Sequence, residues 1–243
     1  MRAYVTGAAI DAMLTRGKED VLYETTIDCI LVAECGEELV RIQDVDPRIS
    51  IDIKERRRMY DDETLYARAS VAHALAAANR ALSSDGLALK VFDAYRPLEY
   101  QQMRFEQQYK AVREQNPGWS EQQVRDETFI RVFPPSTNPQ TPPAHSTGGA
   151  IDLTIVDNEG NELDMGSGYG EFESPYLAAN APGLDGKPHE NRVLLITTMA
   201  KQGFMCFPGE WWHYSMGDRE WSAYLGLPYA IYGRMNDPYK QKA

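Results

Sequence analysis

Two short stretches carry residues that could hold a metal ion. The first, AHSTGGAID from Ala144 to Asp152, places a histidine seven positions before an aspartate, with two glycines between them. In a strand that begins after the glycines, the aspartate lies on the face opposite to its apolar neighbours. Gly148 and Gly149 let the backbone bend, which would bring the His145 imidazole over that polar face. A metal shared by His145 and Asp152 would explain the pattern, but a solvated loop histidine and an unrelated strand-edge acid explain it equally well.

The second stretch, PGEWWHY from Pro208 to Tyr214, adds a carboxylate and another histidine. Glu210 and His213 are three positions apart, but the Pro-Gly pair and the two tryptophans favour a strand or loop over a zinc-binding H-E-x-x-H helix. Two histidines and Asp152 would leave zinc an open position for water, and Glu210 could accept the proton of that water. The alternative is a core strand whose glutamate pairs with an arginine.

A third motif supplies a cation. DAYRP, from Asp93 to Pro97, follows a predicted strand, so Arg96 could stabilise the oxyanion that develops during amide hydrolysis. Taken alone, an arginine at a strand end is more often part of a surface ion pair. The other two histidines, His73 in an alanine-rich helix and His189 at a helix start, are interpreted as structural.

The elements that must position these motifs alternate without a βαβ rhythm, which predicts an α+β fold with a central, mostly antiparallel sheet flanked by helices. We expect helices over 62–82, from Leu98, from a capping box at Ser120 and over about 190–203. We expect strands over 28–33, 87–93 and 150–156, and a terminal β region over 204–216. A Pro-rich loop over 134–149 leads into the first motif, as functional loops often do.

Composition narrows the function classes. The chain has 243 residues, 43% of them hydrophobic, and is expected to form a single domain over 1–243. Its net charge of −11 disfavours nucleic acid and anionic membranes as partners. The N-terminal segment is too interrupted by charges to be a signal peptide and no stretch is long enough to span a bilayer, so we predict a cytoplasmic protein. Three cysteines are expected to be buried thiols; the oligomeric state is not predicted.

The motifs DAYRP, HSTGGAID, DMG and GEWWH occur in an order that resembles the VanX-type D-alanyl-D-alanine dipeptidases. These are zinc peptidases of family M15, related to the D-Ala-D-Ala carboxypeptidases and the hedgehog zinc domain. The resemblance covers roughly residues 62–214, and residues 1–60 match less clearly. It implies one Zn²⁺ per chain bound by His145, Asp152 and His213, with Glu210 as general base and then acid. It also implies that Arg96 stabilises the tetrahedral intermediate, and that the fold is of the hedgehog and D-Ala-D-Ala peptidase type.

The resemblance also implies the substrate, D-Ala-D-Ala or a similar small D-containing dipeptide. Two positions depart from the family pattern: Pro143 replaces a serine, and Gly170 replaces the aspartate that holds the substrate amino terminus. Glu171, next to Gly170, is the candidate substitute, and Ser146 and Tyr95 are further candidate substrate-binding residues. The alternatives are a peptidoglycan D,D- or L,D-carboxypeptidase or endopeptidase of the cell wall, and a non-catalytic zinc-binding module.

Overall fold

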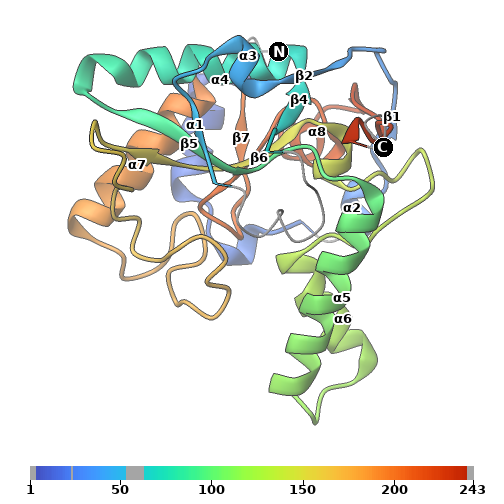
Figure 1. Ribbon diagram of the computed structural model, residues 1–243. Coiled ribbons are helices and arrows are strands. Elements are labelled where there is room, and N and C mark those ends of the chain that lie inside the picture. The colour runs from blue at the N-terminus through green and yellow to red at the C-terminus, as the bar shows by residue number, and fades with distance from the viewer. Residues whose placement is uncertain (1–3, 23, 53–62, 240–243) are drawn as a thin grey trace.

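A five-stranded sheet in the order β3-β5-β6-β8-β7 forms the centre of the molecule (Figure 1). The computed structural model describes residues 4–22, 24–52 and 63–239. The strands are Ser50–Ile51 (β3), Ala88–Asp93 (β5), Ala150–Val156 (β6), Met205–Cys206 (β7) and His213–Ser215 (β8). β3 runs parallel to β5, whereas the pairs β5–β6, β6–β8 and β8–β7 are antiparallel. The predicted α+β fold with a mostly antiparallel sheet is therefore confirmed.

Helices cover one face of this sheet. α4 (Ala69–Leu82) packs on β5 and on α7 (Gly186–Ala200), and α1 (Gly7–Thr15) packs on α7. Ile151, Leu153 and Ile155 of β6 are fully buried in the core that these helices share. Because successive side chains of a strand alternate between faces, Asp152 points to the other side of the sheet.

A helical hairpin projects from the end of the sheet (Figure 1). It consists of α5 (Leu98–Gln115) and α6 (Glu121–Arg131), and α6 begins with the predicted capping box of Ser120 and Gln123. The smaller elements are α2 (Glu24–Ile27), α3 (Ile42–Val45), α8 (Arg219–Tyr224), the 3₁₀ helices η2 (Lys18–Asp20), η4 (Ser83–Asp85) and η5 (Ala144–Thr147), and the paired strands β1 (Leu31–Val32) with β9 (Tyr229–Ala230) and β2 (Leu39–Arg41) with β4 (Tyr66–Arg68).

The helix predicted over 62–82 is shorter than expected. It begins at Ala69, because the preceding Tyr66–Arg68 segment forms strand β4 and pairs with β2; Asp62 lies outside the described residues. Here a tertiary pairing outweighs local helix propensity. The helix expected over 190–203 is α7, which begins earlier, at Gly186, and ends at Ala200.

Two further predictions of burial are wrong, because the residues concerned are exposed. The apolar run over 28–33 forms only the two-residue strand β1, and its Leu31 is 55% exposed, so this is not a buried strand. Of the three cysteines, Cys206 is buried as predicted, whereas Cys29 and Cys35 are exposed. Among the described residues, no helix is long and apolar enough to cross a membrane.

The buried carboxylate of Asp46, which directly follows α3, connects this part of the chain to α4 and the sheet. Asp46 is 3% exposed and accepts a hydrogen bond from the Asn79 side chain of α4 at 3.1 Å. Asn79 in turn accepts one from the backbone N–H of Leu89 in β5 at 2.8 Å. Hydrogen bonds from Arg48, with a smaller contribution from Asn79, outweigh burial and lower the pKa of Asp46 to about 2.

We predict that Asp46→Asn lowers the free energy of unfolding by about 1–2 kcal/mol at pH 7, because the ion pair with Arg48 is lost. The pKa of Asp46 is lower in the folded state, so its stabilisation is present above pH 3.8 and disappears as the pH falls toward 2. Urea unfolding at pH 7 and pH 3 measures the difference. The exposed Asp44→Asn is the control, and an Asp46→Asn effect that does not shrink at pH 3 contradicts the ion-pair assignment.

Candidate metal centre and active site

The strand register places three polar side chains in one row. Asp93 of β5 pairs with Asp152 of β6, and Asp152 pairs with His213 of β8. Paired residues on neighbouring antiparallel strands point to the same face of a sheet. The row therefore crosses three adjacent strands on the face opposite to α4 and α7.

His145 reaches this row from η5, just before β6. Gly148 ends η5 with a φ of +76°, a left-handed conformation that glycine adopts without strain. At Gly149, a Cβ atom would lie 2.6 Å from the backbone oxygen of Met216, so only glycine fits between the strands. The two glycines therefore form the predicted bend that brings His145 beside Asp152.

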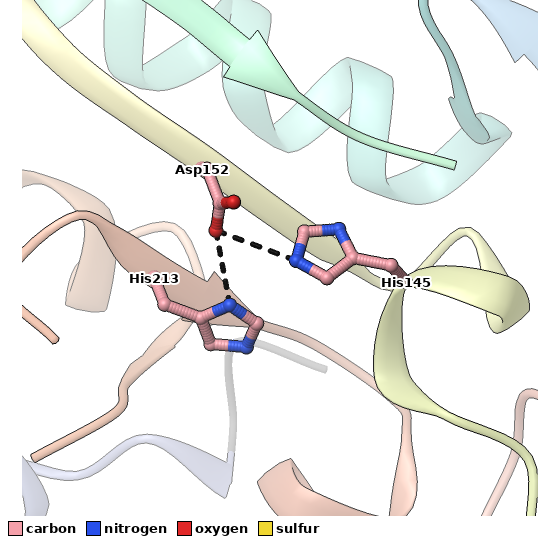
Figure 2. A group of neighbouring side chains, drawn as sticks. All are labelled: His145, Asp152 and His213. Carbon is pink, nitrogen blue, oxygen red and sulfur yellow. Dashed lines mark hydrogen bonds and ion pairs between the residues drawn. The ribbon is translucent and has the colours of Figure 1, made fainter. Parts of the chain in front are cut away.

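The three candidate ligands surround one small volume (Figure 2). Asp152 Oδ1 lies 3.4 Å from His145 Nε2 and 3.0 Å from His213 Nδ1. One possible ligand atom from each residue lies within 4.8 Å of the others, and all three residues are buried. Two ring nitrogens and a carboxylate oxygen form a donor set that suits zinc with an open fourth position.

The outer nitrogens of the two rings have their own partners. His145 Nδ1 lies 2.8 Å from the backbone oxygen of Ala94; since a carbonyl only accepts, Nδ1 carries the proton and Nε2 is free to bind a metal. His213 Nε2 lies 3.6 Å from the Glu220 carboxylate, so a proton on Nε2 would face an anion and leave Nδ1 for the metal. A carboxylate behind a ligating histidine is a common way to orient the ring.

Charge compensation keeps the centre ionised. Burial alone would raise the pKa of Asp152, but the two imidazoles, His145 first, hold it well below its usual range. Burial would lower the pKa of His213, but the charge of Glu220 and the hydrogen bond to Asp152 raise it well above the usual value. The proton on His213 and the nearby Arg96 guanidinium therefore offset the buried carboxylate charges around Asp152.

Glu210 lies beside this cluster in the turn before β8. Its backbone N–H donates to the Phe207 carbonyl at 3.4 Å, so Glu210 belongs to a turn and not to an H-E-x-x-H helix, as predicted. Among the described residues, its Oε1 atom is buried without a hydrogen-bond partner. Burial, with a smaller contribution from the Asp152 charge, raises the pKa of Glu210 to about 8.

Arg96 is fixed at the edge of the row. Asp93 accepts hydrogen bonds from its Nε and Nη2 atoms at 3.1 and 2.9 Å, and the Gln101 side chain accepts from Nη1 at 2.9 Å. The same guanidinium lies 3.9 Å from the Asp152 carboxylate. Arg96 is therefore a buried cation beside the centre, and not the surface ion pair that its position alone would suggest.

These residues open onto one pocket of about 540 Å³, a volume that includes its solvent-facing mouth. Its walls include the five candidate catalytic and metal-binding residues His145, Asp152, His213, Glu210 and Arg96. His73 and His189 are exposed and outside the cluster.

The three predicted substrate-binding residues do not line this pocket. Ser146 is buried and donates to the Arg96 backbone oxygen at 2.8 Å, and the Tyr95 hydroxyl donates to the Met235 backbone oxygen at 3.2 Å. Glu171 is exposed and accepts from the Gly168 backbone N–H at 3.0 Å, within its own loop. Their substrate-binding roles stay predictions.

Several residues that line the pocket were not predicted from the sequence, and three of them are polar neighbours of the centre. The Tyr169 hydroxyl donates to Asp152 Oδ2 at 3.2 Å, Glu220 stands behind His213, and Arg104 of α5 faces the pocket. Tyr169 lies in the glycine-rich loop that follows β6. Its position near the DMG motif is the feature of the sequence that could have indicated a role in the site. Glu220 and Arg104 sit on helices whose sequences carry no sign of the site.

A family model, Peptidase_M15, described as D-ala-D-ala dipeptidase, matches residues 49–237. A D-alanyl-D-alanine dipeptidase from Synechocystis is 35% identical over 150 residues, which cover 54% of this chain and 60% of that protein. The chain thus spans about three fifths of the length of that relative. A D-alanyl-D-alanine dipeptidase from Escherichia coli is 28% identical over 186 residues, covering 74% of this chain and 84% of that protein.

Among solved structures, the chain is similar to "VanYB in complex with D-Alanine-D-Alanine". The TM-score is 0.44 at 16% identity, covering 82% of this chain and 93% of that one.

We predict that Glu220→Gln weakens zinc binding about 10- to 100-fold, because the His213 ring loses the carboxylate that holds its outer nitrogen. Competition with a chromophoric chelator measures the zinc affinity directly. Glu190→Gln, which removes an exposed carboxylate paired with Lys187, is the matched control and should leave the affinity unchanged. Equal zinc affinities of the Glu220→Gln and Glu190→Gln variants would exclude this role.

Proposed function

The chain belongs to the D-Ala-D-Ala dipeptidase family, Peptidase_M15, and on this premise we propose that it is a zinc dipeptidase that hydrolyses D-Ala-D-Ala or a similar small D-containing dipeptide. The observation that carries the proposal is the buried Asp152 carboxylate, held between two imidazoles at the wall of a pocket that also contains Glu210 and Arg96. Simple metal binding would need neither of the last two residues.

His145 Nε2, Asp152 Oδ1 and His213 Nδ1 are the atoms proposed to hold one Zn²⁺ per chain. When bound, zinc supplies Lewis-acid chemistry, because it acidifies water and polarises a carbonyl group. The chain contributes the orientation of the ligands, through the Ala94 carbonyl behind His145 and the Glu220 carboxylate behind His213.

Glu210 is the proposed proton carrier. A buried carboxylate with a pKa near 8 can both take up and release a proton at neutral pH, and a neighbouring cation would favour its charged form. In its charged form, Glu210 accepts a proton from the attacking water. The resulting neutral acid then donates the proton to the leaving amine, which separates as the peptide bond breaks.

Arg96 is proposed to stabilise the oxyanion. Asp93 and Gln101 occupy three of its five N–H donors and hold the guanidinium plane in place, which leaves two donors for an oxygen in the pocket. A cation fixed before the reaction stabilises developing negative charge without reorganisation.

We propose, as the sequence predicts, that the chain forms a single domain, acts on a small dipeptide and is located in the cytoplasm. The net charge of −11 remains the argument against nucleic acid as a partner.

We predict that Glu210→Gln lowers kcat at least 100-fold while zinc stays bound, because the amide cannot accept the proton of water. Release of alanine from D-Ala-D-Ala and the zinc content of the purified variant are the two measurements. The exposed Glu114→Gln serves as the control. Full activity of Glu210→Gln would refute the proton-transfer role, and loss of zinc would show that Glu210 is needed for the metal.

A comparison of three peptide substrates tests the proposed substrate class. We predict hydrolysis of free D-Ala-D-Ala at a kcat/KM at least about 100-fold above that of L-Ala-L-Ala and N-acetyl-D-Ala-D-Ala. Preference for the N-acetylated substrate would instead favour a peptidoglycan carboxypeptidase. No hydrolysis of any of the three by the zinc-loaded protein would favour the non-catalytic zinc module.

A further inference from the structure

Among the described residues, three arginines line the pocket, and two of them are held by neighbouring carboxylates. Arg96 is bound to Asp93, as described above. Arg131 forms ion pairs with Glu127 at 3.0 Å and with Glu173 at 2.6 Å. Both guanidinium groups are therefore already committed to partners within the protein.

Arg104 is different. It lies on α5 one turn beyond Gln101, is partly buried, and forms no hydrogen bond or ion pair with a described residue. The charged and polar groups around it are Tyr169, Tyr100, Asp93 and, with the same sign of charge, Arg96. A guanidinium carries five donors, so Arg104 has donors available for a ligand in the pocket that it lines.

Tyr169 is a neighbour of both Arg104 and the candidate metal centre. The Tyr169 hydroxyl bonds to Asp152 at 3.2 Å and is also an electrostatic neighbour of Arg104. Arg104 therefore lies on the α5 side of the pocket, near the centre but without an ion pair to Asp152. In a dipeptide, the free carboxylate belongs to the residue whose nitrogen lies in the cleaved bond, so its carbon is about 2.5 Å from that nitrogen.

We propose that Arg104 binds the free α-carboxylate of the substrate and is a specificity-determining residue. This inference rests on the proposed function and deepens it. A planar guanidinium forms two parallel hydrogen bonds to a carboxylate, which fixes the orientation of the ligand as well as its charge. Arg104 then selects peptides that end one residue after the cleaved bond, and it disfavours internal bonds and blocked C-termini.

The test compares D-Ala-D-Ala with D-alanyl-D-alaninamide, which lacks only the carboxylate charge. The wild-type protein should prefer the free acid about 10- to 100-fold in kcat/KM, and Arg104→Gln should reduce this ratio to near 1, mainly through KM. Arg104→Lys, which keeps the charge, should restore part of the preference. Arg125→Gln, on the exposed surface of α6 and outside this pocket, is the matched control and should keep the wild-type ratio.

An equal loss of activity on both substrates, with the preference unchanged, would overturn the proposal, because that result indicates a structural role. A binding experiment separates this failure from failure of the proposed function. Calorimetry of D-Ala-D-Ala with zinc-loaded Glu210→Gln, and with the same protein carrying Arg104→Gln, should show affinity about 10- to 100-fold weaker in the double variant. If the wild type hydrolyses neither substrate, the proposed activity is wrong. Equal affinities of the two variants in the calorimetric experiment would exclude Arg104 as the residue that binds the carboxylate.

Discussion

Burial of the Asp152 carboxylate is the constraint on which the rest of the structure depends. An isolated buried charge costs several kcal/mol, so the fold must bring partners to it from distant parts of the chain. The register of β6 with β8 brings His213, and the glycine bend before β6 brings His145. A one-residue slip of β6 would turn Asp152 toward the helices and expel its apolar neighbours from the core. The packing of the core and the geometry of the site are therefore fixed by the same register.

The balance of charge around Asp152 argues that the centre is built for a cation. Glu210 and Glu220 both lie near the His213 imidazole, which also contacts Asp152, so several buried carboxylates surround this one ring. The metal-free protein compensates by holding protons, because the pKa of His213 is raised and that of Glu210 is about 8. A divalent cation would displace the histidine proton and favour a charged Glu210. Metal binding and activation of the proposed base are therefore coupled through one electrostatic field.

The parts of the fold and site that could be predicted are those with a local cause. Alternation along β6 identified Asp152, the two glycines identified the bend at His145, and Ser120 with Gln123 identified the start of α6. The start of α4 was wrong because the pairing of β4 with β2 depends on residues far apart in sequence. Glu220 and Arg104 carry no local signal, since their roles depend on where α8 and α5 lie relative to the sheet.

The two sides of the pocket are built from different kinds of element. On the metal side, Asp152 and His213 lie on paired strands and are fixed by their register, whereas His145 lies on η5 and Glu210 in a turn. The other side is built from the α5–α6 hairpin and the loop after β6. Pro143 and Gly170, the two positions at which the sequence is expected to depart from the family pattern, lie just before η5 and in that loop. Under the proposed function, the ligands on β6 and β8 depend on the register of the sheet, whereas the wall that would contact the rest of the substrate comes from helices and a loop.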